Sequence, residues 1–225
     1  SKAIIAISNH TKKTIVEKYN VPPEKIYVTH LAANPIYFEP QEPGRLREIK
    51  NKYQLPDRFV FYPAFTWPHK NHMTLLNALS IYAKNHGSQI PLILTGSQKE
   101  AKINILERIE SLQLEGTVKF LGFVPTEDMP SLYQLSSALV FPSLFEGFGM
   151  PVLEAMASGC PVACSNVTSL PEIVGDTAVT FDPLNAEAIA GSVYTLLHDE
   201  EIRSRNVQRA RERAKMFSWE KTAAQ

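Results

Sequence analysis

The sequence feature that most restricts the fold of this chain is an alternation of short apolar runs with longer amphipathic segments. The runs are almost wholly apolar, which is typical of strands buried on both faces of a parallel sheet. Segments with helical spacing of apolar residues lie between them, such as 72–85 and 101–112. This alternation predicts an α/β fold with a Rossmann-like, doubly wound parallel sheet. The runs lie at 3–7, 26–29, 59–64, 91–95, 118–121, 138–141, 161–164 and 178–181.

Length and composition fit such a fold. The chain has 225 residues, of which 44% are hydrophobic and 20% charged, so it can bury a large core without disulfides or metals. No apolar run approaches the roughly 18 residues of a membrane span. The two cysteines, Cys160 and Cys164, cannot build a disulfide framework. We therefore expect a cytoplasmic protein, with the inner face of the membrane as a possible place within the cytoplasm.

The formal net charge is zero, but the charge is unevenly distributed. Residues 1–112 carry 15 basic and 9 acidic residues, and residues 113–225 carry 8 and 14. No segment has the continuous basic field of a nucleic-acid binder, so we expect no nucleic-acid partner. Residues 203–225 hold seven basic and two acidic residues. They are interpreted as a solvated helix face or, alternatively, as a peripheral contact with anionic lipid headgroups.

The segment 141–157 carries the strongest chemical signal. A buried strand ends at Phe141, a loop with Gly147 and Gly149 follows, and a helix opens with Pro151 in its first turn. The unpaired N–H groups of a helix N-terminus and the positive end of its dipole favour phosphate. In open α/β sheets, ligands bind beyond the carboxyl ends of the strands.

Two acidic residues belong to this segment. Glu154 lies in a helix that is apolar nearly all round, where a carboxylate is costly unless it is hydrogen-bonded. Two kinds of hydrogen-bond partner can stabilise this carboxylate. One is a vicinal diol such as that of a ribose, and the other is a backbone group in the core or at a helix cap. Glu146 lies eight residues earlier in the loop, where it can face a ligand.

At these residues the chain resembles the retaining glycosyltransferases of family 4 (group 1), which have the GT-B fold. Glu146 and Glu154 match the E-x7-E signature of that family. The resemblance covers the whole chain and is most specific between residues 141 and 176. It rests on the sequences EGFGMP at 146–151, GCPVA at 159–163, LPEIVGD at 170–176, HKN at 69–71, TG at 95–96 and LGFV at 121–124.

The resemblance implies a role for each matching residue. Glu154 would hold the ribose hydroxyls, and Lys70 would neutralise the diphosphate leaving group. Glu146 would face the hydroxyls of the donor sugar, so Glu146 and Lys70 are the candidate catalytic residues. The remaining candidates for nucleotide-sugar binding are the backbone of Phe148 and Gly149, then Gly147, Met150, Gly96 and His69, with Phe123 and Val124 beside the base.

The resemblance also implies transfer with retention of configuration and without a metal ion or other cofactor. Many relatives carry an arginine soon after the first strand of this domain, and here the sequence reads Ala64-Phe65-Thr66-Trp67-Pro68. His69 or main-chain amides would have to replace it. His69 and His72 are only two candidate ligands, so we expect no metal site.

The function implied is that of the donor-binding portion of a hexosyltransferase in polysaccharide biosynthesis. It would move a hexose, with mannose favoured, from a nucleoside-diphosphate sugar to a glycan or lipid-linked acceptor. The alternatives are an epimerase of nucleoside-diphosphate sugars or a phosphorylase with the GT-B fold, and a noncatalytic module that binds sugar nucleotides.

Three parts of the chain are expected. Residues 1–40 would be the last strand and helix of a missing acceptor domain, followed by a linker rich in proline between residues 31 and 43. Residues 41–216 would form the nucleotide-sugar-binding domain. Residues 217–225 would begin a truncated crossover helix, and the acceptor would bind through the missing N-terminal domain.

Overall fold

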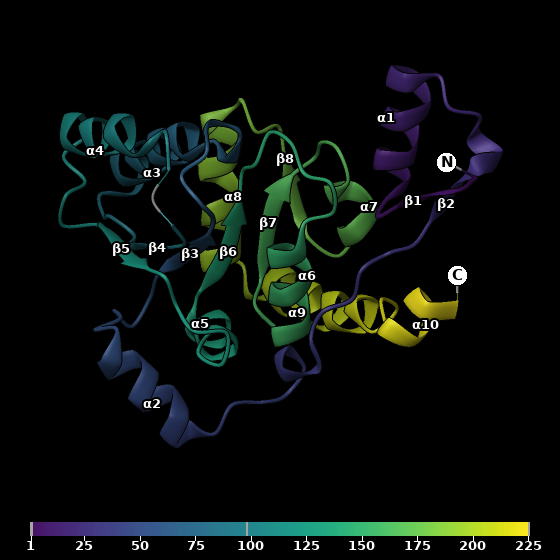
Figure 1. The fold of residues 1–225 in the computed structure, drawn as a ribbon. Helices are drawn as coiled ribbons and strands as arrows, with labels where there is room; N and C mark the ends of the chain where they lie inside the picture. Colours follow the sequence, from purple (N-terminus) through teal and green to yellow (C-terminus); the bar gives the residue numbers. More distant parts are fainter. Residues whose placement is uncertain (1, 98, 225) are drawn as a thin grey trace.

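The fold contains two parallel β-sheets (Figure 1). The computed structural model describes residues 2–97 and 99–224. Each of the eight apolar runs contains a strand, which confirms the predicted α/β class. The larger sheet has the order β5-β4-β3-β6-β7-β8. Its strands are β3 (Val60–Pro63), β4 (Leu92–Thr95), β5 (Val118–Gly122), β6 (Ala138–Phe141), β7 (Val162–Ser165) and β8 (Val179–Phe181).

Helices cover both faces of this sheet. On one face α3 packs against α4 and α8, and on the other α6 packs against α5 and α9 (Figure 1). The short helix α7 follows β7. The bounds are α3 (His72–His86), α4 (Lys102–Ser111), α5 (Met129–Leu135), α6 (Met150–Ser158), α7 (Leu170–Val174), α8 (Ala186–His198) and α9 (Glu200–Ala214).

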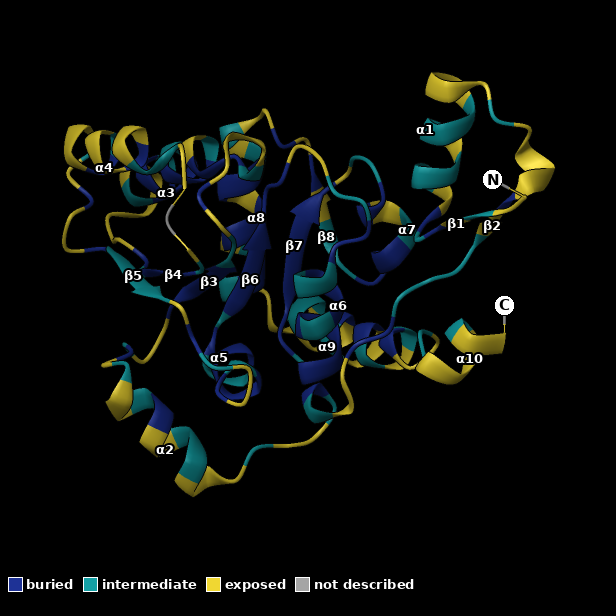
Figure 2. Cartoon of the chain, in the orientation of Figure 1, coloured by how far each residue is buried: buried dark blue, intermediate teal, exposed yellow. Residues whose placement is uncertain are grey.

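The double cover explains why the strands read as continuous apolar runs. Every residue of β4, β6 and β7 is buried, and Figure 2 shows the buried residues concentrated along the central strands. The largest fully buried side chains include Tyr62 and Phe141. The edge strand β5 is only half-buried. Both cysteines are buried free thiols, as their apolar surroundings predicted.

The first part of the chain forms the second sheet. β1 (Ile4–Ala6) pairs in parallel with β2 (Ile26–Val28), and α1 (Asn9–Tyr19) with the 3-10 helix η1 (Pro23–Lys25) connects them. This unit lies beside α7, away from the rest of the large sheet (Figure 1). The domain boundary near residue 40 stays a prediction.

The linker and the last helix run along the large domain. The linker contains the 3-10 helix η2 (Pro35–Tyr37) and leads to α2 (Pro43–Lys52). Buried Asp128 accepts hydrogen bonds from Lys52 and Tyr53 and forms an ion pair with Arg45. These contacts hold α2 to the start of α5. At the other end, α10 (Trp219–Ala224) bonds to the linker through the Thr222 hydroxyl and the carbonyl of His30.

The basic side chains of α9 are largely engaged within the protein. Arg209 pairs with Asp176, Arg211 donates to the carbonyl of Phe38, and Arg213 donates to the carbonyl of Ile173. Intramolecular contacts therefore account for part of the basic stretch without a lipid partner. In the described ranges 2–97 and 99–224, no helix is both long and apolar enough to cross a bilayer.

The strand order creates a switch point between β3 and β6. From β3 the chain adds strands outward through β4 to β5, and from β6 it adds them in the opposite direction through β7 to β8. Loops that leave the carboxyl ends of β3 and β6 therefore diverge, and a crevice remains between them. This is where the sheet positions its candidate site.

Candidate active site

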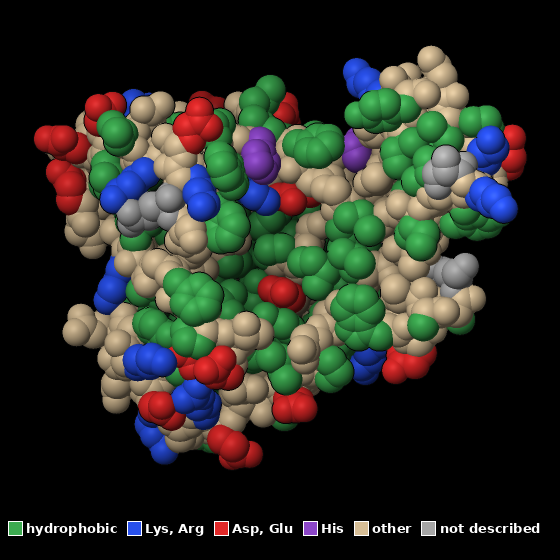
Figure 3. Space-filling model, viewed as in Figure 1, with side chains coloured by type: hydrophobic (Ala, Val, Ile, Leu, Met, Phe, Trp, Pro, Cys, Tyr) green, Lys and Arg blue, Asp and Glu red, His purple; other side chains and the backbone are tan. Residues whose placement is uncertain are grey.

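A cavity of about 430 Å³ lies at the carboxyl ends of the central strands. In the space-filling view the centre of this face is hollowed and lined mostly by hydrophobic side chains (Figure 3). Acidic and basic side chains meet at its upper edge, and another acidic group lies within it. The cavity is lined by Pro63, Ala64, Phe65, Lys70, Thr95, Gly96, Met129, Tyr133, Pro151 and Glu154.

Lys70 brings positive charge to one end of this cavity. It ends the 3-10 helix η3 (Pro68–Lys70), which follows β3, and its Nζ atom lies 2.6 Å from Oε1 of Glu146 in the loop after β6. The two side chains are only 17% and 12% exposed. The Lys70 ammonium also lies 5.6 Å from the ring centre of Phe141. The switch point therefore brings a cation and an anion together from segments 76 residues apart.

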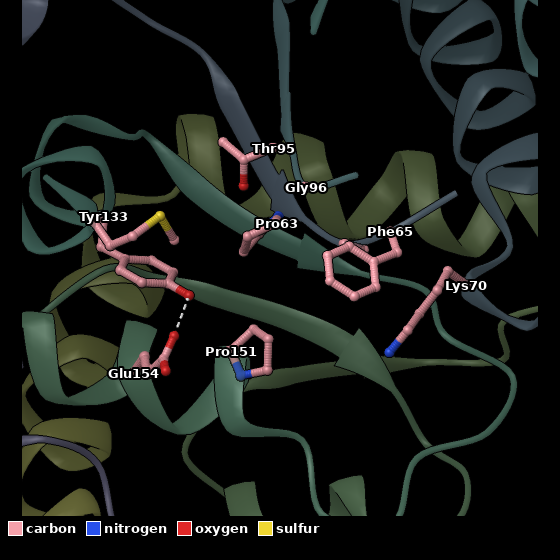
Figure 4. A pocket seen from close by; sticks show the side chains of 10 residues that line it. Pro63, Phe65, Lys70, Thr95, Gly96, Tyr133, Pro151 and Glu154 are labelled. Carbon is pink, nitrogen blue, oxygen red and sulfur yellow. Dashed lines mark hydrogen bonds between the residues drawn. The ribbon is translucent and has the colours of Figure 1, made fainter. Parts of the chain in front are cut away.

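Glu154 brings a carboxylate to the other end (Figure 4). It projects from α6, and its Oε2 atom accepts a 2.8 Å hydrogen bond from the hydroxyl of Tyr133. Burial raises the pKa of Glu154 to about 7, although hydrogen bonds from Tyr133 and then Tyr37 lower it. Near neutral pH this carboxyl group is thus close to its protonation midpoint, and a ligand that donates hydrogen bonds would favour the charged form.

The loop before α6 has backbone N–H groups that could bind an anion. Within the described chain, the amides of Phe148, Gly149 and Met150 have no hydrogen-bond acceptor. The Ser169 hydroxyl bonds to the carbonyls of Glu146 and Phe148. These contacts fix the loop through its carbonyls and leave the N–H groups at the helix start available.

Two glycines of the site adopt backbone conformations that other residues rarely adopt. Gly149, immediately before α6, has φ +107°, and a Cβ atom there would lie 2.6 Å from Cδ2 of Leu170. Gly96, which follows β4, has φ +109°, and a Cβ atom there would lie 2.9 Å from the carbonyl oxygen of Ala64. Both positions exclude a side chain for steric as well as conformational reasons.

The structure brings most of the predicted site residues together. Lys70, Glu154 and Gly96 line the cavity, and Glu146 contacts Lys70. Gly147, Gly149 and Met150 form the loop and the start of α6. The carbonyl of Gly147 accepts hydrogen bonds from Ser8 and Thr11.

Four predicted residues lie differently from the others. Phe148 is buried, and its ring packs against His30 and Phe217, so only its backbone is left to contact a ligand. Phe123 is 83% exposed and Val124 is buried, and neither lines the cavity. His69 is exposed, and its carbonyl accepts a hydrogen bond from the amide of Leu144. The roles of these four residues stay predictions.

Comparison with known proteins identifies the family of this chain. Residues 45–213 match the model of the family described as "Glycosyl transferases group 1". The chain belongs to the group 1 glycosyltransferases. It is 37% identical to the O-antigen chain mannosyltransferase B of Escherichia coli over 226 residues, which cover all of this chain and 59% of that protein. It is 32% identical to the serotype-specific mannosyltransferase WbdA of Escherichia coli, over 98% of this chain and 28% of that one.

Solved structures show the same fold. A glycosyltransferase from Rickettsia africae has a TM-score of 0.89 at 24% identity and covers 99% of this chain and 61% of its own. HepE of Anabaena, in complex with UDP-glucose, has a TM-score of 0.84 at 22% identity, with coverage of 96% and 60%. This group 1 glycosyltransferase chain spans less than two thirds of the length of these relatives.

Two tyrosines of the group 1 glycosyltransferase site were not predicted from the sequence. Tyr133 lies on α5 and Tyr37 on the linker helix η2, and both interact with Glu154. A tyrosine in a short apolar helix or beside a proline gives no chemical signal of its own. The only sequence signal for them is indirect: a buried carboxylate such as that of Glu154 needs hydrogen-bond donors.

The two candidate metal ligands do not form a cluster. Among the residues that the structure describes, no three His, Cys, Asp or Glu side chains are placed to hold a metal ion. His72 is buried against the ring of Tyr62, and burial lowers its pKa to about 4. It is therefore neutral near pH 7. Independence of a metal ion stays a prediction.

Proposed function

We propose that this chain is the donor-binding portion of a retaining hexosyltransferase that acts in polysaccharide biosynthesis. One observation carries the proposal. A single cavity has the buried carboxylate of Glu154 at one end and Lys70 at the other, and Pro151 in the first turn of α6, which follows the loop amides without an acceptor, lines it as well (Figure 4). These groups match the two polar parts of a nucleoside-diphosphate sugar, its ribose diol and its diphosphate.

The residues divide the work of donor binding. Glu154 accepts hydrogen bonds from the ribose hydroxyls, and Phe65 and Pro151 form apolar walls of the same cavity. Lys70 and the amides at the start of α6 neutralise the diphosphate, whose negative charge grows as the bond to the anomeric carbon breaks. Glu146, held by Lys70, faces the hydroxyls of the hexose.

The acceptor completes the reaction. Its hydroxyl oxygen forms a bond to the anomeric carbon on the face that the diphosphate leaves, so configuration is retained, and the hydroxyl proton is released. No metal ion is needed in this scheme, because Lys70 and the helix start supply the positive charge. The acceptor is a glycan or lipid-linked glycan that binds chiefly outside residues 41–216, in a cytoplasmic enzyme.

Mannose is the favoured sugar. Two of the curated relatives are named as mannosyltransferases, and one of these as an O-antigen chain enzyme. The HepE structures contain UDP or UDP-glucose, which supports a nucleotide-sugar donor without fixing the base. These relatives do not favour the epimerase, phosphorylase or noncatalytic alternatives.

Thermal unfolding with a panel of nucleotides tests the proposal. We expect GDP, UDP, ADP or dTDP to stabilise the protein, by about 2.7 kcal/mol at a hundredfold excess over Kd. Glu154→Gln, which keeps the shape of the side chain but not its charge, should abolish most of this shift. Glu107→Gln, at an exposed position of α4, is the matched control. If no nucleotide stabilises the wild type, the proposal is wrong.

A further inference from the structure

The carboxylate of Glu154 is hydrogen-bonded by Tyr133, and the ring of Tyr37 packs against that tyrosine. Tyr133 of α5 donates the 2.8 Å hydrogen bond to Oε2, and Tyr37 of the linker provides a second, smaller interaction. Both tyrosines are buried, and their ring centres lie 5.8 Å apart at an interplanar angle of 72°. Phe61 packs edge-on against the other side of Tyr133, at 5.3 Å. The two phenols are therefore fixed in place by packing.

This arrangement leaves room for a ligand on the carboxylate. The two oxygens of an ionised carboxylate can accept about four hydrogen bonds in total. The Tyr133 hydroxyl uses one of them, Tyr37 interacts with the same carboxylate, and Glu154 lines the cavity. The remaining capacity matches the two hydroxyls of a vicinal diol. A protonated carboxyl group would instead present a donor and lose acceptor capacity.

The tyrosines are the groups that favour the charged form of Glu154. Burial raises the pKa of Glu154 to about 7, and the hydrogen bonds from Tyr133 and Tyr37 oppose that rise. Lys70 lies at the opposite end of the cavity, where it pairs with Glu146. Several titratable side chains on elements around α6 have partners elsewhere or are buried thiols: Glu172 of α7, Arg209, Arg211 and Arg213 of α9, and Cys160 and Cys164 beside and within β7.

We propose that Tyr133 and Tyr37 are positioning residues that orient Glu154 and keep it ionised for the ribose hydroxyls. This inference rests on the proposed function for its ligand. It makes the linker part of the nucleotide site, because Tyr37 belongs to η2 and not to the large sheet or its helices. Nucleotide affinity then falls when the pH drops through the range in which Glu154 takes up a proton.

A titration of the ligand-free protein tests the positioning directly. The carboxyl carbon of Glu154 is followed by NMR from about pH 5 to about pH 9, and its signal is assigned by its loss in Glu154→Gln. Tyr133→Phe should favour the protonated form about tenfold, and Tyr37→Phe should do so less strongly. Tyr82→Phe removes another buried hydroxyl, which bonds to His198 far from the cavity, and should change nothing. An unchanged titration in both Tyr133→Phe and Tyr37→Phe would overturn the inference, as would an equal change in Tyr82→Phe.

Calorimetry with GDP-mannose and UDP-glucose gives the functional readout. These sugar nucleotides have no phosphate proton to lose near neutral pH, so a pH dependence in this range reports on the protein. For the sugar nucleotide that binds, we expect the Tyr133→Phe protein to bind about fivefold more weakly at pH 7, because half of the wild-type carboxyl groups are already protonated there, and to recover wild-type affinity near pH 9. A general disturbance of the fold would weaken binding at every pH.

The outcomes separate this inference from the proposed function. If wild type and Glu154→Gln bind both sugar nucleotides equally, or not at all, the proposed function fails and the NMR titration alone decides the positioning role. If binding requires Glu154 but the pH profile of Tyr133→Phe equals that of the wild type, the proposed function stands and the positioning role is wrong.

Discussion

Lys70 and Glu146 show how a single ion pair prepares a site before the ligand arrives. The 2.6 Å contact holds the Lys70 ammonium at the switch point. The Glu146 carboxylate also neutralises the positive charge to which a diphosphate would bind. Among the described residues that line the cavity, Lys70 is the one cation. The free N–H groups at the start of α6 must therefore supply the rest of the attraction.

Removing the lysine should affect the phosphates selectively. We expect Lys70→Ala to weaken nucleoside diphosphates by about 1.5–3 kcal/mol, because a charge-assisted contact is lost. Binding of the corresponding nucleoside should change little. Calorimetry on both ligands measures the difference, with Lys84→Ala on the exposed side of α3 as the control. Equal weakening of nucleoside and diphosphate would refute the phosphate role of Lys70.

At the scale of elements, the strand-loop-helix unit from β6 to α6 depends on its last loop residue. Gly149 combines φ +107° with a neighbour, Leu170, that would clash with any Cβ atom. We expect Gly149→Ala to reduce the free energy of unfolding by about 2 kcal/mol or more and to weaken nucleotide binding. Urea unfolding measures the first effect. The control is Gly191→Ala in α8, where the added Cβ meets nothing within 4 Å and should stabilise the helix. No loss of stability in Gly149→Ala would contradict this account of the loop.

The sequence predicted the elements better than their contacts. Strands buried on both faces need apolar residues throughout, so each of the eight runs could be recognised from residue type alone. The start of the helix in the E-x7-E region could be recognised by Pro151 in its first turn. The contacts between Lys70 and Glu146 and between Tyr133 and Glu154 depend on how distant segments pack, which no local pattern encodes. The resemblance implied that Phe123 and Val124 flank the base; neither lines the cavity, and that role stays a prediction.

At the scale of the whole molecule, Glu172 attaches the N-terminal unit to the large domain. Its carboxylate accepts hydrogen bonds from the backbone amides of Asn9 and His10 at the start of α1, and it lies 2.6 Å from Nε2 of His30. Burial alone would raise the pKa of Glu172, but the bonds from Asn9, then His30, outweigh burial and lower it. One side chain thus connects α7, α1 and the beginning of the linker.

This contact should make stability depend on pH in a defined direction. Because the folded-state pKa of Glu172 is lowered, its contribution is present above the ordinary glutamate pKa of about 4.3 and is lost as the pH falls through the folded value. We expect Glu172→Gln to cost on the order of 1 kcal/mol near pH 7, after solvent screening. The difference from wild type should shrink as the pH falls toward about 3. Urea unfolding at both pH values measures it, with Glu107→Gln as the control. A difference that persists at low pH would show that charge on Glu172 is not the cause.

The central claim is that one cavity binds the two polar parts of a sugar nucleotide at its two ends. A crystal structure of the chain with the sugar nucleotide that binds most tightly tests it most directly. We expect the ribose hydroxyls within hydrogen-bond distance of the Glu154 carboxylate, and the diphosphate between Lys70 and the amides at the start of α6. A nucleotide bound elsewhere, or one in this cavity with its phosphates at Glu154, would contradict the account.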